Sequence, residues 1–336
     1  MKFITSSKEE YPTSSWIKEL AKHLDITFES NDSKILKSKK PCLIWNPIAN
    51  IISSEYDWKK KLYKRLKQNN QTVYTVERGY LPDCLYIDKY GALANSNSYN
   101  KKNWDKKLSI DKYKQVEKYI KSFIEDSSTL EEQKRGRIAE EGFYSKLRIK
   151  KKQIKVFVPL QKANDTVILL WSDWIKGIKK FKTTINELAQ ENPDILFLVK
   201  SHPRRLTNKM RTRDNIINVD DFHYKDCIQH SDVILTINSG VGLQAMMWNK
   251  PVITIGKAFY HFKNINYKAN NKEEIIKYIK EAKKPDTEEV KRFIYFLRYN
   301  FYTECKMEDL QPVKINKIIF EHPNTTEKII IQCKQT

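Results

Sequence analysis

The sequence predicts an α/β protein built from two domains that each hold parallel strands, and three observations lead to this prediction. The chain has 336 residues, which suits two domains of about 150 residues better than one compact core. Hydrophobic residues make up 40% of the chain, enough to fill such cores. Short apolar runs alternate with amphipathic stretches in both halves, as strands and helices do in parallel α/β sheets. We place the domains at 1–150 and 151–310, followed by a tail at 311–336.

In the first half, a short apolar run at 41–46 ends at a proline and predicts a buried strand. Residues 56–69 repeat an apolar side chain every four positions between lysines, which predicts an amphipathic helix. The β-branched run at 72–76 predicts the next strand, so that the three segments form a βαβ unit. Further helices are predicted at 110–126 and, in a polar stretch, at 128–149.

The second half restarts the alternation. Its run at 195–199 is apolar throughout, as expected of a parallel strand that is buried on both faces. Strands are predicted at 154–158, 195–199, 233–237 and 252–255, with edge strands at 317–320 and 328–331. Helices are predicted at 175–191, 223–230, 240–248, 272–282 and 286–301. A second parallel sheet therefore follows the domain boundary.

The formal net charge of +21 creates a field that attracts nucleic acids, anionic membranes, nucleotide sugars and acidic glycans without choosing among them. The densest basic run lies at 146–155. It is interpreted either as a solvated linker and helix face or as a patch that docks on a membrane or a polymer. No RRM, KH, zinc-finger or helix-turn-helix signature supports nucleic-acid binding.

The five cysteines contain no CxxC pair, which argues against a zinc or redox motif and against a disulfide framework. His223, His230 and His261 have no metal-ligand spacing and are interpreted as structural. The first residues lack the apolar core of a secretory signal, and no stretch approaches the roughly 20 apolar residues of a membrane span. We therefore expect a reducing cytoplasmic location, with peripheral contact at the inner membrane as an open alternative, and no metal or cofactor.

Three polar loops directly follow predicted strands of the second half, at the sheet edge where parallel α/β proteins bind ligands. The first runs from Gln161 to Asp165. Its carboxylate suits a nucleophile, a base or a hydroxyl binder, and equally a helix N-cap. The second holds Lys200, His202 and Pro203, where cationic side chains in a restrained loop suit a phosphate. An ordinary surface loop explains the second loop equally well.

The third loop joins a strand to an apolar helix through a small polar turn, Asn238-Ser239-Gly240. Backbone N–H groups and the helix dipole at such a turn favour a phosphate or a carboxylate, and Gly240 and Gly242 permit a close approach. The turn is neither a Walker loop nor a GxGxxG dinucleotide motif. Because all three loops leave strand ends of one sheet, we expect them to face a single crevice.

Together these motifs resemble the bacterial capsule polysaccharide biosynthesis family, which contains the β-Kdo glycosyltransferases. The resemblance rests on the QxxxD loop at 161–165, the Lys-x-His-Pro loop at 200–203 and, most specifically, the stretch INSGVGLQAMMWNKPVITIGKAFY at 237–260. A fainter match in the first half runs through Glu77-Arg78-Gly79, Leu81-Pro82-Asp83 and Asp88.

The resemblance implies a GT-B fold, with two Rossmann-like domains whose parallel sheets face a central cleft. It implies a nucleotide-sugar donor, typically CMP-β-Kdo, a glycan or glycolipid acceptor, and no catalytic metal. Asp165 would be the nucleophile of a retaining double displacement, while His202 and the Ser239 turn would hold the CMP phosphate. The predicted donor-binding residues are Gln161, Lys200, His202, Pro203, Asn238, Ser239, Gly240 and Gln244. The family commonly has an acidic residue in place of Gln244, which puts the nucleotide contacts there in doubt.

Glu77 is the candidate base for the acceptor hydroxyl, because its strand-end loop belongs to the opposite domain. A salt bridge to Arg78 or a loop-capping role explains Glu77 nearly as well. The predicted acceptor-side residues are Arg78, Gly79 and Asp88. Two alternatives stay open: another CMP- or UDP-sugar as the donor, and a non-catalytic basic scaffold of a polysaccharide assembly complex.

Overall fold

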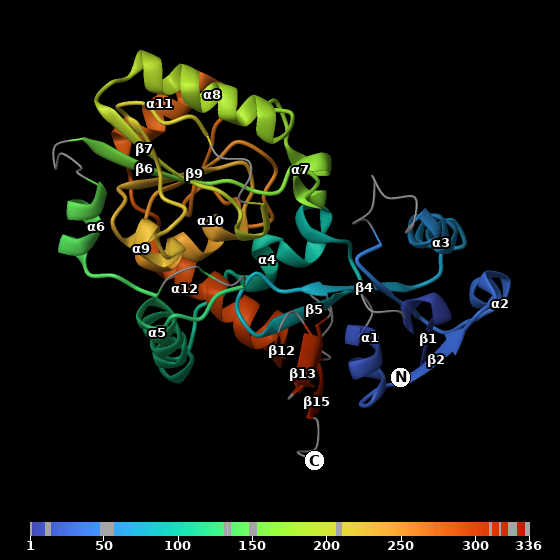
Figure 1. Ribbon diagram of the computed structural model, residues 1–336. Coiled ribbons are helices and arrows are strands. Elements are labelled where there is room, and N and C mark those ends of the chain that lie inside the picture. The colour runs from blue at the N-terminus through green and yellow to red at the C-terminus, as the bar shows by residue number, and fades with distance from the viewer. Residues whose placement is uncertain are drawn as a thin grey trace. The chain divides into compact units, whose positions relative to one another are not determined.

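The chain forms two compact units (Figure 1). The computed structural model describes residues 2–332 apart from 11–14, 48–56, 131–132, 134–135, 148–152, 206–209, 309–310, 316 and 322–327. The first unit combines Met1–Lys106 with Phe293–Thr336, and the second is the continuous stretch Lys107–Arg292. Each unit has its own sheet, so the predicted α/β class holds for both.

The first unit contains a seven-stranded sheet of order β13-β12-β5-β4-β3-β1-β2. Its strands are β1 (Lys2–Ser6), β2 (Asp25–Glu29), β3 (Cys42–Trp45), β4 (Val73–Arg78), β5 (Cys84–Asp88), β12 (Tyr302–Glu308) and β13 (Gln311–Ile315). The strands from β2 to β4 are parallel, whereas β5, β12 and β13 are each antiparallel to their neighbours. A separate hairpin pairs β14 (Lys317–Glu321) with β15 (Lys328–Gln332).

Helices cover both faces of the parallel part of this sheet. The helices are α1 (Ser15–Ala21), α2 (Asp32–Lys37), α3 (Asp57–Gln68) and the single turn α4 (Lys101–Trp104). Trp16, Ile17 and Leu20 of α1 pack with one face of the sheet. Leu62 and Leu66, four residues apart on α3, pack with the other face, as the four-residue apolar spacing predicts.

The second unit contains a six-stranded, wholly parallel sheet of order β11-β10-β9-β6-β7-β8. Its strands are β6 (Ile154–Pro159), β7 (Ile195–Lys200), β8 (Ile216–Asn218), β9 (Val233–Thr236), β10 (Val252–Thr254) and β11 (Tyr267–Lys268). Numbered along the chain, this is the 3-2-1-4-5-6 order of the Rossmann fold. The strands predicted at 154–158, 195–199, 233–237 and 252–255 are all present, and the short strands β8 and β11 were not predicted.

Helices lie on both faces of this sheet (Figure 1). The helices of the second unit are α5 (Ile110–Glu125), α6 (Glu140–Leu147), α7 (Thr166–Trp171), α8 (Gly177–Glu191), α9 (Tyr224–Gln229), α10 (Gly240–Ala245) and α11 (Lys272–Glu281), and α12 (Thr287–Tyr295) crosses the boundary at Arg292. Helix α8 buries Ile178, Phe181, Ile185 and Leu188 against the strands, together with α11. Helices α9 and α10 lie on the opposite face (Figure 1).

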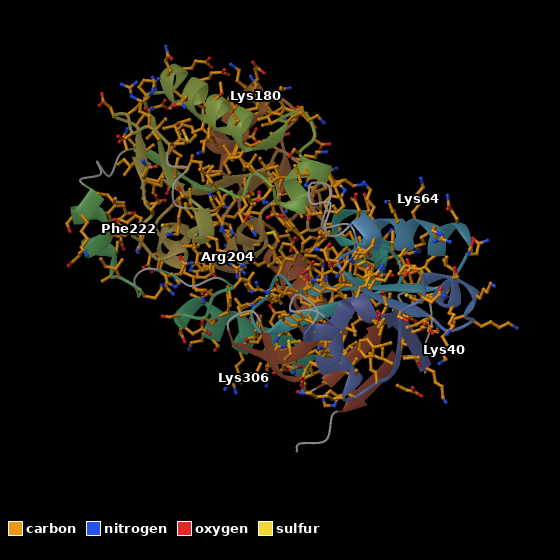
Figure 2. The ribbon with its side chains drawn as sticks, turned by 45° about the vertical axis from the view of Figure 1, so that its right-hand side comes forward. Lys40, Lys64, Lys180, Arg204, Phe222 and Lys306 are labelled. Atoms are coloured by element: carbon orange, nitrogen blue, oxygen red, sulfur yellow. The ribbon has the colours of Figure 1, made fainter. Side chains whose placement is uncertain are left out.

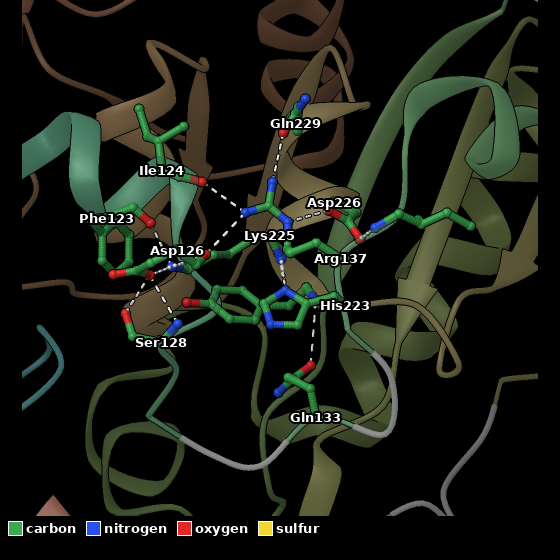
Figure 3. A network of polar contacts seen from close by, with 12 residues as sticks. Phe123, Ile124, Asp126, Ser128, Gln133, Arg137, His223, Lys225, Asp226 and Gln229 are labelled. Carbon is green, nitrogen blue, oxygen red and sulfur yellow. Dashed lines mark hydrogen bonds and ion pairs between the residues drawn. The ribbon is translucent and has the colours of Figure 1, made fainter.

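The units divide the chain at Lys106 and Arg292, not near 150 and 310 as predicted. The first boundary lies before α5 because a network of polar contacts binds the segment after α5 to α9 (Figure 3), and the second lies at Arg292 because β12 pairs with β5 of the first sheet. The Arg137 guanidinium pairs with Asp226 and donates to the backbone oxygen of Ile124 at 2.8 Å. The Lys225 ammonium, fully buried, donates to Asp126 Oδ1 at 2.6 Å and lies 4.0 Å from the centre of the Phe123 ring.

The tail predicted at 311–336 belongs to the first unit. Strand β13 extends the large sheet, and the predicted edge strands at 317–320 and 328–331 pair with each other as β14 and β15. The predicted helix at 286–301 is α12, continued by a π-helical stretch over Phe296–Phe301.

Basic side chains are exposed on both units. Lys64 on α3, Lys180 on α8 and Lys306 on β12 are all exposed (Figure 2). Of the basic run at 146–155, residues 148–152 lie outside the described residues.

Candidate functional site

The second sheet reverses its strand order between β6 and β9, which are neighbours. In open α/β sheets, ligands bind outside the carboxyl ends of the strands at such a reversal. The three predicted loops follow β7, β6 and β9, which lie side by side in the order β9-β6-β7. The structure therefore brings the three loops to one edge of one sheet, as predicted.

The QxxxD loop divides into a buried and a partly exposed residue. Gln161 is buried, and its amide exchanges two hydrogen bonds with Asn238: Nε2 donates to Oδ1 at 3.1 Å, and Oε1 accepts from the Asn238 backbone at 3.3 Å. Asp165 is partly exposed and caps α7, accepting from the backbone N–H of Val167 at 3.2 Å. The N-cap interpretation of Asp165 is thus correct, and it leaves a catalytic role open.

The Lys-x-His-Pro loop divides in the same way. Lys200 is 6% exposed, and its ammonium donates to the backbone oxygens of Asp220 at 2.9 Å and Phe222 at 2.7 Å. His202 and Pro203 are partly exposed, and His202 Nδ1 accepts from the Arg204 backbone at 3.3 Å. The Lys200 side chain thus binds the segment that follows β8, a contact that its position in the sequence did not reveal.

The third loop accepts a hydrogen bond from a buried aromatic side chain. Ser239 caps α10, accepting from the Val241 backbone at 3.2 Å, and its own carbonyl accepts from the hydroxyl of buried Tyr260. A Cβ added to Gly242 would lie 2.5 Å from that hydroxyl oxygen. Gly242 therefore makes room for Tyr260 within the protein, and the sequence-based idea that it admits a ligand is wrong.

The predicted donor-binding residues separate by exposure into two groups. Of these, His202, Pro203, Ser239 and Gly240 are partly exposed at the sheet edge, where a ligand can reach them, and so is the predicted nucleophile Asp165. Gln161, Lys200, Asn238 and Gln244 are buried. The buried group suits a supporting role better than direct contact with a ligand.

The predicted acceptor-side residues lie on the first sheet, and they do not share one face. Strand β4 runs to Arg78, and the Gly79 N–H donates to the Cys84 oxygen at 2.8 Å, so that the chain turns directly into β5. Glu77 is therefore a strand residue opposite Tyr86, where a strand-end loop was predicted. Since side chains alternate along a strand, Arg78 points to the other face.

Asp88 lies on the Glu77 face, at the end of β5. Its carboxylate is buried and accepts from the Ser98 hydroxyl at 2.8 Å, from the Ser96 hydroxyl and from the Tyr90 backbone at 2.8 Å. Burial raises the pKa of Asp88, and these hydrogen bonds oppose that shift. The observed contacts fold the segment after β5, and a role for Asp88 toward an acceptor stays a prediction.

Two supporting residues were missed from the sequence. Asp220 follows the unpredicted strand β8, and its Oδ1 accepts from the Ser201 backbone at 2.6 Å, which fixes the start of the His202 loop. Tyr260 lies within the motif at 237–260, and no role was assigned to it from the sequence. Its hydroxyl donates to the carbonyl of Ser239, so the two ends of that motif are in contact.

The sequence also argued against a metal site, a disulfide framework and a membrane span. No cluster of three or more His, Cys, Asp or Glu side chains that could hold a metal ion occurs among the residues that the structure describes. Cys42, Cys84, Cys227 and Cys305 are free and buried there, and Cys333 lies outside the described residues. Within the same part of the chain, no helix is long and apolar enough to cross a bilayer.

The two Rossmann-like units and the loop cluster define an α/β protein of the kind that binds nucleotides at a sheet edge. The profile of the capsule polysaccharide biosynthesis protein family matches residues 99–302, more than half of the chain. The chain therefore belongs to this family.

Two solved structures of Thermosulfurimonas dismutans KpsC have a similar fold. The β-Kdo 2,4-transferase superposes with a TM-score of 0.66 at 16% identity, covering 94% of this chain and 95% of that one. The β-Kdo 2,7-transferase gives a TM-score of 0.60 at 15% identity, covering 94% and 96%. At such identities the likeness concerns the fold, and it confirms the predicted GT-B class.

Two curated proteins are similar in sequence over 151 residues. Protein FixF of Sinorhizobium fredii (strain NBRC 101917 / NGR234) is 29% identical over 44% of this chain, and the capsule polysaccharide export protein KpsS of Escherichia coli is 25% identical over 41%. These matches span 37% and 38% of the two relatives, so most of each relative has no counterpart in the aligned region.

Proposed function

We propose that the chain is a glycosyltransferase of surface-polysaccharide assembly that transfers Kdo from CMP-β-Kdo to a glycan or glycolipid. The observation that carries this proposal is the meeting of partly exposed Asp165, His202 and Ser239 at the carboxyl edge of a sheet with Rossmann strand order. Membership of the capsule family and the fold shared with the KpsC transferase structures support it. CMP-Kdo in particular is taken from the likeness to β-Kdo transferases.

Each of the three residues has a task in the proposed reaction. An Asp165 carboxylate oxygen attacks the anomeric carbon, the bond from that carbon to the phosphate oxygen breaks, and its electron pair leaves with CMP. His202 and the Ser239 turn lie where they can stabilise the charge that develops on the phosphate. An acceptor hydroxyl then loses its proton to a base and displaces Asp165, so that the anomeric configuration is retained. Glu77 stays the predicted base.

The N-cap contact of Asp165 is compatible with this role. A carboxylate that accepts a backbone N–H at 3.2 Å is held in one orientation by the helix that it caps. An oriented nucleophile loses less freedom on reaching the transition state than a mobile one. The proposal gives the Lys200 ammonium a supporting role, since it donates to two backbone oxygens of the β8–α9 segment.

Substitution of Asp165 tests the proposal. Asp165→Asn keeps a cap acceptor but removes the nucleophile, so we expect it to abolish transfer from CMP-Kdo while the affinity for CMP stays nearly unchanged. His202→Ala should weaken CMP binding directly. Titration calorimetry with CMP, UMP and UDP, followed by product analysis with CMP-Kdo, measures both effects. Wild-type turnover by the Asp165→Asn variant would contradict the nucleophile assignment. Selective binding of UDP in the titration would replace CMP-Kdo by a UDP-sugar as the proposed donor.

A further inference from the structure

We infer that Gln161 and Asn238 are a positioning pair that sets the distance between Asp165 and Ser239, and that neither side chain contacts the donor. This inference rests on the proposed function, because it concerns the two groups that would act on the anomeric carbon and on the phosphate. It also assigns a role different from the donor binding that the sequence motifs predicted for both residues.

The pair lies where β6 and β9 end. Gln161 follows β6 and Asn238 follows β9, and the two exchange hydrogen bonds of 3.1 and 3.3 Å at the reversal of strand order. Asn238 is 4% exposed and Gln161 is 9% exposed. The pair thus joins the segments that follow two neighbouring strands at the point where ligands bind in such sheets.

The amide nitrogen of Asn238 also holds helix α7. Its Nδ2 donates to the backbone oxygens of Val167 at 2.9 Å and Trp171 at 3.2 Å, and to that of Lys257 at 3.4 Å. Three carbonyl oxygens around one NH2 group leave it no capacity for a further acceptor. The side chain is therefore committed to the protein and is not available to a nucleotide.

These contacts connect the two reacting groups through a short path. Asp165 caps α7, the helix whose carbonyls Asn238 holds, while Ser239 is the next residue after Asn238. A change in the pair would move Asp165 relative to Ser239 and leave each group chemically intact. Because a displacement of about 1 Å can slow a reaction about a hundredfold, such a change should affect the chemical step more than binding.

The test compares three variants with a matched control. Gln161→Met removes both hydrogen bonds between residues 161 and 238, one to the Asn238 side chain and one from its backbone N–H, at nearly constant volume, and Asn238→Ala removes the contacts to α7. Gln161→Glu can restore both bonds when its carboxyl is protonated, since it then has one donor and one acceptor. Asn215→Ala is the control: Asn215 is 9% exposed and donates to three backbone oxygens, those of Ala189, Asn192 and Ile195, at the amino end of the same sheet.

Two quantities are measured for each full-length variant: the dissociation constant for CMP, and the single-turnover rate of CMP release from CMP-Kdo, which needs no acceptor. We expect Gln161→Met and Asn238→Ala to lower the rate at least about tenfold with the dissociation constant within about twofold of wild type. Asn215→Ala should keep the wild-type rate while its melting temperature falls. The Gln161→Glu rate should recover, relative to wild type, as the pH is lowered.

Each outcome has one meaning. A wild-type rate in both Gln161→Met and Asn238→Ala overturns the positioning role. A loss of CMP affinity in proportion to the loss of rate also overturns it, because the pair would then be a binding contact. An equal loss of rate in Asn215→Ala reduces the effect to general destabilisation and also overturns it. If the wild-type chain releases no CMP from CMP-Kdo, the proposed function fails and this inference falls with it. If Asn238→Ala does not fold, the two Gln161 variants decide the question.

Discussion

Gly242 and Tyr260 should be energetically coupled, because the hydroxyl of Tyr260 occupies the space that a side chain at 242 would need. A Cβ at 242 would lie 2.5 Å from the Tyr260 oxygen, 3.1 Å from its Cζ and 3.2 Å from Val252 Cγ1. Tyr260 is fully buried, and its hydroxyl donates to the Ser239 carbonyl. The ring cannot retreat from the added methyl group without breaking that hydrogen bond.

The expected free energies follow from these contacts. Gly242→Ala adds an overpacking cost of about 2 kcal/mol and endangers a hydrogen bond that contributes about 1 kcal/mol, against about 1 kcal/mol gained in helix propensity. The net destabilisation is about 2 kcal/mol. Tyr260→Phe alone should cost about 1 kcal/mol, since it removes the hydroxyl. In a chain that already carries Tyr260→Phe the shortest contact is absent, so adding Gly242→Ala should cost roughly nothing.

In the double-mutant cycle, the doubly substituted chain should therefore be about 2 kcal/mol more stable than the sum of the two single effects predicts. The free energies of unfolding are measured by urea unfolding followed by circular dichroism. Gly136→Ala is the matched control, because a Cβ there meets no atom within 4 Å. It should change the free energy of unfolding little. Effects of Gly242→Ala and Tyr260→Phe that add within about 0.5 kcal/mol would refute the reasoning.

Two further predictions concern the second unit. Burial lowers the pKa of His223 to about 4, below its ordinary 6.5, and its Nδ1 accepts from the Lys225 backbone, which requires the neutral ring. The contribution of neutral His223 to the free energy of unfolding is therefore complete above pH 6.5 and is lost as the pH falls toward 4, by up to roughly 3 kcal/mol. His223→Asn can still cap α9 and should flatten the pH dependence of the free energy of unfolding between pH 6.5 and 4. An unchanged slope in this variant would exclude His223 as the source of that dependence. A fragment of residues 107–292 should fold alone, as judged by a cooperative thermal transition, whereas a fragment of residues 151–310 should not. The shorter fragment lacks Asp126 and Arg137, so the charges of Lys225 and Asp226 would be buried without their partners. Cooperative folding of the shorter fragment would contradict this.

Much of the second unit could be predicted from the sequence because its signals are local. The strand Ile195–Lys200 is buried on both faces, and its first five residues are apolar, which is the local signal that predicted it. The short strand Ile216–Asn218 could not be predicted in this way, since three residues in a polar stretch carry no periodicity. The strand Cys84–Asp88 was missed because its identity depends on antiparallel pairing with both Val73–Arg78 and Tyr302–Glu308.

The sequence by itself determined the α/β class, the loops that carry the candidate residues and the edge of the sheet where they meet. Only the tertiary structure decided which of these residues face outward and which are buried supports. The physical reason is that burial and hydrogen bonding depend on partners distant in the chain: Gln161 and Asn238 are separated by 77 positions, and Arg137 and Asp226 by 89. A motif records that such residues are present, whereas the packing of strands from distant segments determines whether an amide or a charge contacts a ligand or holds the protein together.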